Sequence, residues 1–280
     1  MIIIKLMIVL FVLMLVAGGN RGLDSFFALI RTMLAFLANI YLISWGTPPI
    51  LTTALVSIFV VVTVIYFQNG FNGKMHAATF SVVIVLGMIM VSAGPLLWSA
   101  GISGYDEIEQ YEEISMYLSA DLQVSMSAVM LSAVMLGLLG AVIDTAVAIT
   151  TAMNEVYVNR NGLSPAQLFR SGMTIGKDIL GTTMNTLFFA GIGEGIMLAV
   201  LFMRNGDTFS EIINSKALFR EVSGMVMGAA GCLLIIPVSS IICASCLTLS
   251  QDKEVCDKNM LRKCYIYCKK VLKNVKNVLK

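Results

Sequence analysis

The residue whose type and position most clearly suggest a chemical role is Asp144, which lies in the middle of a long apolar stretch. It is the only formally charged residue between Ser125 and Met153. A charged group at the centre of a bilayer costs roughly 2.5–3.5 kcal/mol on insertion scales. Such a residue usually faces a protein interior and marks the path of an ion, a proton or a substrate. Asp144 is therefore the first candidate for ion or proton coupling.

Small and polar residues share one predicted helix face with Asp144. Residues separated by four, seven or eleven positions lie on the same side of a helix. This spacing places Thr151 and Glu155 toward one end of the face, and Gly140 and Gly137 toward the other. Glycines allow a neighbouring backbone to approach closely, so the face predicts contact with another helix.

The next apolar stretch carries polar residues at a matching depth. The two stretches run antiparallel, and at about 1.5 Å per residue Asp144 and Asn185 lie similarly far from the shared loop. A carboxyl, an amide and hydroxyl groups are therefore predicted to meet at mid-membrane. The predicted coupling residues are Asp144, Thr145, Thr182, Asn185 and Thr186, and the secondary candidates are Thr151, Glu155, Asp178 and Glu194.

Two hypotheses follow for the Asp144 carboxyl. An unpaired carboxyl is neutral in a dry site and ionised in a wet one or beside a cation, so it can load and release a proton or Na⁺. Alternatively, it stays protonated and hydrogen-bonds Asn185 or a threonine, joining two helices. Arg31 is the base nearest that depth in the spans, and it either snorkels to the interface or pairs with Asp144.

Glu194 is a second acid within an apolar stretch, and Gly191, Gly193 and Gly195 surround it. Glycine weakens a helix, so this segment predicts irregular backbone. Glu194 then either lines a vestibule or snorkels to the nearby interface.

Membrane-spanning helices must position these residues. The chain has 280 residues, of which 58% are hydrophobic and only 13% charged, whereas an average soluble domain has about 25% charged residues. Recurring apolar runs of about 20 residues exclude a soluble enzyme and predict an all-α fold, a polytopic transmembrane helical bundle of about seven spans. The predicted spans are 2–17, 25–45, 48–67, 77–100, 124–153, 179–203 and 223–248. The first span also resembles the apolar core of a signal peptide, but we expect that it is not cleaved.

The distribution of Lys and Arg predicts an external amino terminus and a cytoplasmic carboxyl terminus. The first, third and fifth loops contain bases and the second and fourth contain none, although Lys5 and the sixth loop depart from this trend. Residues 251–280 form a basic cytoplasmic tail. Residues 101–123 hold six acids and no base, with apolar residues at helical spacing. They predict an external amphipathic helix, either simply solvated or open to cations or a partner.

The six cysteines all lie in the last span or the tail, where thiols stay reduced, so we expect no disulfide framework. Cys243 and Cys246 fit apolar packing better than a metal site, because no histidine accompanies them. The tail cysteines also fit palmitoylation. With no nucleophile–base pair, phosphate loop or metal cluster visible, we expect no enzyme, cofactor, metal or nucleic acid.

Two runs resemble the YibE/F family of bacterial membrane proteins: GAVIDTAVA at 140–148 and GKDILGTTMNTL at 176–187. The resemblance covers most of the chain and is most specific over 137–190. Members of this family often occur as a half with an external domain and a half without one, and this chain resembles the latter. The resemblance implies a multi-pass protein of the bacterial cell membrane, acting as a homo-oligomer or with a related half that carries an external domain.

The same segment is more distantly similar to the membrane halves of SecD/SecF and RND permeases. That similarity implies a half-transporter in which Asp144 is the coupling acid and Asn185 and Thr186 face it. Since no large porter domain or second half is present, a partner or a homodimer is needed. We predict a subunit of a transport-type complex coupled to protons or Na⁺, with no substrate named. The alternative is a non-transporting scaffold or accessory subunit for a partner with an external domain.

Overall fold

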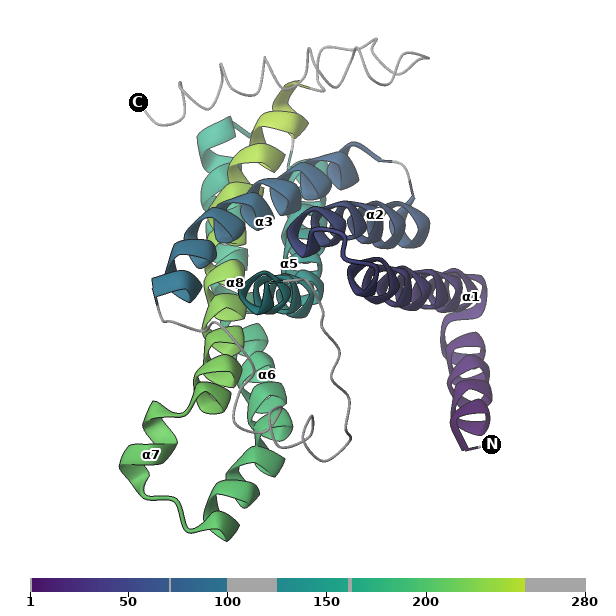
Figure 1. The fold of residues 1–280 in the computed structure, drawn as a ribbon. Coiled ribbons are helices and arrows are strands. Elements are labelled where there is room, and N and C mark those ends of the chain that lie inside the picture. The colour runs from purple at the N-terminus through teal and green to yellow at the C-terminus, as the bar shows by residue number, and fades with distance from the viewer. Residues whose placement is uncertain (1, 71, 100–124, 161–162, 250–280) are drawn as a thin grey trace. The chain divides into compact units, whose positions relative to one another are not determined.

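The computed structural model describes residues 2–70, 72–99, 125–160 and 163–249, and the regular elements there are all helices. Within these described residues, six helices are long and apolar enough to cross a membrane. The predicted all-α membrane bundle is therefore confirmed. The predicted external helix at 101–123 and the tail at 251–280 lie outside the described residues. The helices are α1 (Ile2–Ser44), α2 (Pro49–Asn69), α3 (Gly73–Ser99), α5 (Met126–Asn159), α6 (Pro165–Asn205), α7 (Phe209–Asn214) and α8 (Lys216–Leu249), as Figure 1 shows.

The chain divides into two compact units. The first unit comprises residues 1–72 and 94–136, and the second comprises residues 73–93 and 137–280. Packing of α1 against α2 builds the first unit, whereas packing of α6 and the inner part of α5 against α8 builds the second.

The first two predicted spans form the single element α1, which bends at Gly19. This residue has φ 54° and ψ −133°, a non-helical conformation that glycine adopts without a Cβ clash. The rings of Phe11 and Phe26, one on each side of the bend, have centroids 4.8 Å apart. The two arms therefore touch at the corner (Figure 1). The expected seven spans correspond to six long helices, the first of which has two arms.

The helix α6 begins at a capping box. Ser164 is the N-cap residue: its hydroxyl accepts from the Gln167 backbone N–H, and the Gln167 side chain accepts from the Ser164 N–H, with Pro165 as the first helical residue. The expectation of irregular backbone around Glu194 is wrong. The helix runs from Pro165 to Asn205 and stays helical through Gly191, Gly193 and Gly195. Gly191 instead serves packing, because a Cβ there would collide with Met225 of α8.

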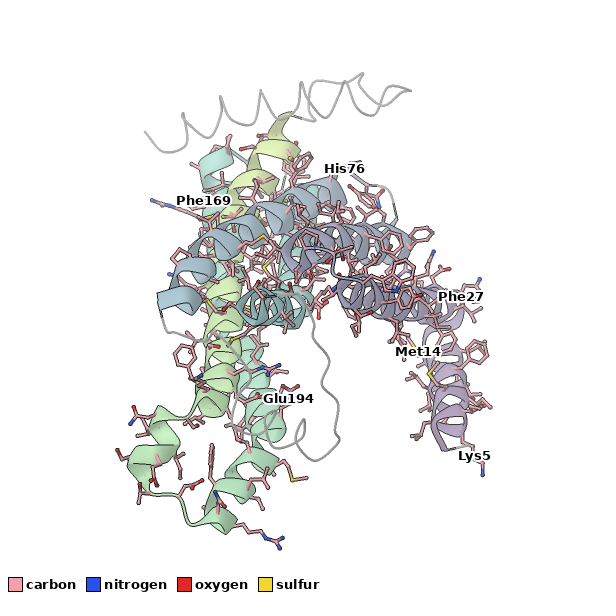
Figure 2. All side chains as sticks on the ribbon, viewed as in Figure 1. Lys5, Met14, Phe27, His76, Phe169 and Glu194 are labelled. Atoms are coloured by element: carbon pink, nitrogen blue, oxygen red, sulfur yellow. The ribbon has the colours of Figure 1, made fainter. Side chains whose placement is uncertain are left out.

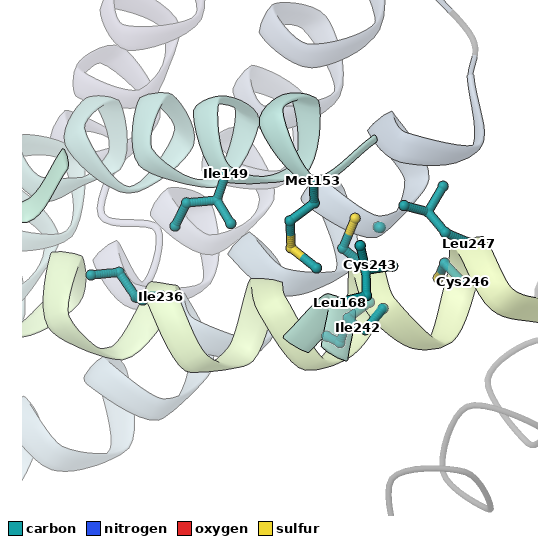
Figure 3. Close-up of a cluster of buried hydrophobic side chains, with 10 residues drawn as sticks. Ile149, Met153, Leu168, Ile236, Ile242, Cys243, Cys246 and Leu247 are labelled. Atoms are coloured by element: carbon teal, nitrogen blue, oxygen red, sulfur yellow. The ribbon is translucent and has the colours of Figure 1, made fainter. Parts of the chain in front are cut away.

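Glycines of α6 bring this helix close to α8. A Cβ on Gly176 would collide with Ile236, and one on Gly172 would collide with Ser240 of α8 and Met153 of α5. Around this contact lies a cluster of buried apolar side chains from α3, α5, α6 and α8, shown in Figure 3. The cluster comprises Ala77, Ile149, Met153, Leu168, Ile236, Ile242, Cys243, Ala244, Cys246 and Leu247. It packs the end of α5 and the start of α6 against the last part of α8.

Candidate functional site

Asp144 lies on the side of α5 that is not packed against α8. The opposite side of α5 is buried, with Leu138 and Val142 at 2% and 0% exposure. Asp144 itself is exposed, as are Gly137 and Gly140. A Cβ on either glycine would meet nothing within 4 Å. The predicted face of small residues around Asp144 is therefore present, and it is open in the single chain.

The neighbouring Thr145 faces the interior instead. Its hydroxyl is buried, donates to the Ala141 carbonyl at 2.8 Å, and lies 4.0 Å from the Cys232 sulfur of α8. Thr145 therefore lies in the contact between α5 and α8, while Asp144, the residue before it, lies on the open face of α5.

The polar residues of α6 point away from α8. Thr182, Asn185 and Thr186 are exposed, whereas Gly172 and Gly176 on the packed face are buried. The Thr182 hydroxyl donates to the Ile179 carbonyl at 2.8 Å, and the Thr186 hydroxyl donates to the Thr182 carbonyl at 2.9 Å. Both hydroxyls are thus satisfied within their own helix.

The hydrogen bonds found between described residues do not join Asp144 to Thr182 or Asn185. The structure gives a carboxyl on an open face of α5 and an amide and two hydroxyls on an open face of α6. Whether these groups meet in the working protein stays a prediction.

The secondary candidates lie in different surroundings. Thr151 is half-buried, while Asp178 and Glu194 are exposed on α6, with Glu194 labelled in Figure 2. Glu155 lines a groove between the end of α5 and the start of α6. Sequence reasoning missed this groove, although basic residues on both sides of the loop signal it.

The cysteines of α8 belong to the packed core. Cys243 and Cys246 are buried in the apolar cluster, and the Cys243 sulfur lies 3.9 Å from the Thr150 carbonyl oxygen. This agrees with their interpretation as apolar packing residues. Across 2–70, 72–99, 125–160 and 163–249, no group of three or more His, Cys, Asp or Glu side chains is arranged to hold a metal ion.

The fold and its apolar helices define a multi-pass integral membrane protein. Residues 6–249 match the family model of the YibE/F-like proteins, so the chain belongs to this family. No curated protein and no solved structure matches the chain. The more distant similarity to SecD/SecF and RND permeases gains no support from these matches and stays a prediction.

Proposed function

We propose that this chain is an ion-coupled subunit of a membrane transport complex, in which Asp144 takes up and releases a proton or Na⁺. The observation that carries the proposal is a lone acid on an open face of a membrane helix. Leaving an ionised carboxyl against acyl chains costs several kcal/mol, so this face needs a polar or protein environment.

The shape of the face fits a neighbouring helix. Gly137 and Gly140 leave space on the same side as Asp144, and small residues allow helices in membranes to approach closely. The occupant is a second copy of this chain or a related half that carries an external domain. With the amino terminus outside and the tail in the cytoplasm of a bacterial cell, the complex places Asp144 near the middle of the cell membrane.

The open face of α6 supports the same proposal. Thr182 and Asn185 are exposed on a helix whose opposite side packs against α8. The amide of Asn185 also needs a polar partner in a membrane. Two open polar faces on consecutive helices provide carboxylate, hydroxyl and amide oxygens for a proton or a small cation that moves between them.

The alternative function is that of a non-transporting scaffold, with Asp144 permanently protonated. The small residues near Asp144 support this second candidate as well, because they favour helix association whatever the acid does. The two candidates differ in whether Asp144 changes its protonation state.

Carbodiimide labelling separates them, since this reagent modifies protonated carboxyls in apolar surroundings. The full-length protein, reconstituted in lipid nanodiscs, is labelled between about pH 5 and pH 9, a range that brackets buried carboxyls. Peptide mass spectrometry then quantifies the modification. Under the transport proposal, labelling of Asp144 falls as the pH rises, and Na⁺ protects the residue if Na⁺ is the coupling ion.

Two variants control the labelling experiment. Asp144→Asn removes the signal, and Glu194→Gln, which changes the other acid within a span, leaves it unchanged. Labelling that stays constant across the pH range favours the scaffold. No labelling at any pH contradicts both candidates.

A further inference from the structure

A polar groove lies where α5 ends and α6 begins, within the second unit. Its volume is about 590 Å³, and it opens to the surface. Residues on both sides of the loop at 160–164 form its walls. The lining residues are Glu155, Val156, Asn159 and Arg160 from the α5 side and Arg170, Ser171, Thr174 and Ile175 from α6.

We propose that this groove binds a phosphodiester group, and that the group belongs to the headgroup of an anionic phospholipid. Arg160, which follows the end of α5, and Arg170 of α6 supply two guanidinium groups to the lining of one groove. A guanidinium binds phosphate oxygens through two parallel hydrogen bonds, which makes arginine the preferred residue for this anion.

Both guanidinium groups are available for a ligand. Arg160 and Arg170 are exposed, and in the part of the chain that the structure describes neither forms an ion pair, including with Glu155 in the same groove. The hydroxyls of Ser171 and Thr174 donate to carbonyls of their own helix. The two arginines therefore carry the recognition.

The charge of the groove selects the type of phosphate. Two arginines and Glu155 give the lining a net charge of one positive unit. A phosphodiester carries one negative charge and matches this balance, whereas a phosphomonoester carries nearly two at neutral pH. Glu155 can also accept hydrogen bonds from hydroxyls on a headgroup such as glycerol.

The wall behind the groove is rigid. Val156 lines the groove and also packs against the buried cluster of Figure 3, in which Met153 and Leu168 are both 0% exposed. Phe169, labelled in Figure 2, packs against the same cluster next to Arg170. Because the helix ends are fixed by this packing, the backbones that carry the two arginines are held in place before any ligand arrives.

The position of the groove along the membrane normal indicates that the phosphodiester group belongs to a lipid. The predicted span in α5 ends at residue 153 and the predicted span in α6 starts at residue 179, so the groove residues between them lie at the level of the headgroups. Basic grooves between transmembrane helices at the cytoplasmic surface are typical binding sites for anionic lipids. The other source of the same chemistry is a soluble phosphate ester.

Native mass spectrometry of the full-length protein in detergent tests the proposal. The probes are phosphatidylglycerol, phosphatidylcholine and inorganic phosphate. We expect phosphatidylglycerol to bind more tightly than phosphatidylcholine. The double variant R160Q/R170Q should bind phosphatidylglycerol about tenfold or more weakly, since a surface arginine contributes roughly fivefold to anionic lipid binding.

Arg204→Gln is the matched control, because Arg204 is an exposed arginine at the other end of α6. It should bind phosphatidylglycerol as the wild type does, and Glu155→Gln should bind it more tightly. If R160Q/R170Q and Arg204→Gln lose the same amount of phosphatidylglycerol binding, or if neither loses any, the proposed site is wrong. Displacement of phosphatidylglycerol by inorganic phosphate at similar concentration would overturn the lipid assignment. Since Asp144→Asn should leave lipid binding unchanged, this test is independent of the coupling proposal.

Discussion

The guanidinium carbon of Arg31 lies 3.8 Å from the centre of the Phe67 ring, so that an arginine of α1 stacks on an aromatic side chain of α2. The Arg31 Nε–H also donates to the Phe27 carbonyl at 3.2 Å. The sequence left two alternatives for Arg31, snorkelling and pairing with Asp144. The contacts that the structure gives Arg31 are those with Phe27 and Phe67, and the choice between the two alternatives stays a prediction.

The substitution Phe67→Leu should weaken the α1–α2 pair. It keeps an apolar side chain but removes the ring that attracts the cation, a contact that stabilises by about 0.5–2 kcal/mol depending on its solvation. We expect a lower melting temperature for the purified protein in detergent. Phe59→Leu, which changes another exposed phenylalanine of α2, is the control. Equal melting temperatures for the two variants would show that the stacking contributes nothing.

A buried hydrogen bond joins the same two helices further along. The Asn39 side-chain amide donates to the Thr53 hydroxyl at 3.1 Å, and both residues are 1% exposed. Replacing Thr53 by Val keeps the volume but leaves the amide without its acceptor. We expect a loss of about 0.6–1.7 kcal/mol in unfolding free energy, the range for such bonds in membrane proteins.

Thr53→Ser is the control for this prediction, since it keeps the hydroxyl. Its stability should fall by less than that of Thr53→Val when both are unfolded by denaturant in detergent. A larger loss for Thr53→Ser would mean that the methyl group, and not the hydrogen bond, stabilises the contact.

The long apolar segments and the helix start at Ser164 could be predicted because each depends on local sequence. The length of an apolar run shows whether it can span a membrane, and a capping box with proline at the first helical position marks the start of a helix. The small residues on the Asp144 face were also predictable, since helical spacing alone places Gly137 and Gly140 there. The contact of this face with a neighbouring helix stays a prediction.

The parts that sequence did not predict depend on tertiary contacts. The glycines near Glu194 predicted irregular backbone, but α6 is continuous there, and Gly191 lies against Met225 of α8. Likewise, the bend at Gly19 makes one element of two predicted spans. Arg160 and Arg170 are close in the sequence, but it is the packing of the end of α5 and the start of α6 that makes them part of one groove.

Glu211 makes the short helix α7 sensitive to pH. Its carboxylate accepts from the Thr208 backbone N–H and hydroxyl, each at 2.7 Å, and these hydrogen bonds lower the pKa of Glu211 below its ordinary value. The stabilisation is therefore fully present above that ordinary value, about 4.3. It is lost as the pH falls through the lower pKa of the folded state.

Hydrogen exchange of residues 208–214 measures this effect. After correction for the intrinsic rates, protection should fall on acidification in the wild type. In Glu211→Gln it should stay nearly independent of pH, because the amide can still accept the bonds but cannot titrate. Glu221→Gln, which changes an acid of α8, should behave as the wild type does. If Glu221→Gln lost the pH dependence of protection, a group other than Glu211 would be responsible for it.

The close approach of α6 to α8 depends on Gly176, and Gly181 on the same helix offers a matched comparison. A Cβ on Gly176 would collide with the stiff, branched side chain of Ile236, whereas a Cβ on Gly181 would meet nothing within 4 Å. Gly176→Ala should therefore cost about 1–3 kcal/mol through overpacking. Gly181→Ala should be neutral or slightly stabilising, since alanine is the better helix former. Thermal unfolding of both variants in detergent tests the packing, and equal melting temperatures would mean that α6 and α8 are not held together at Gly176.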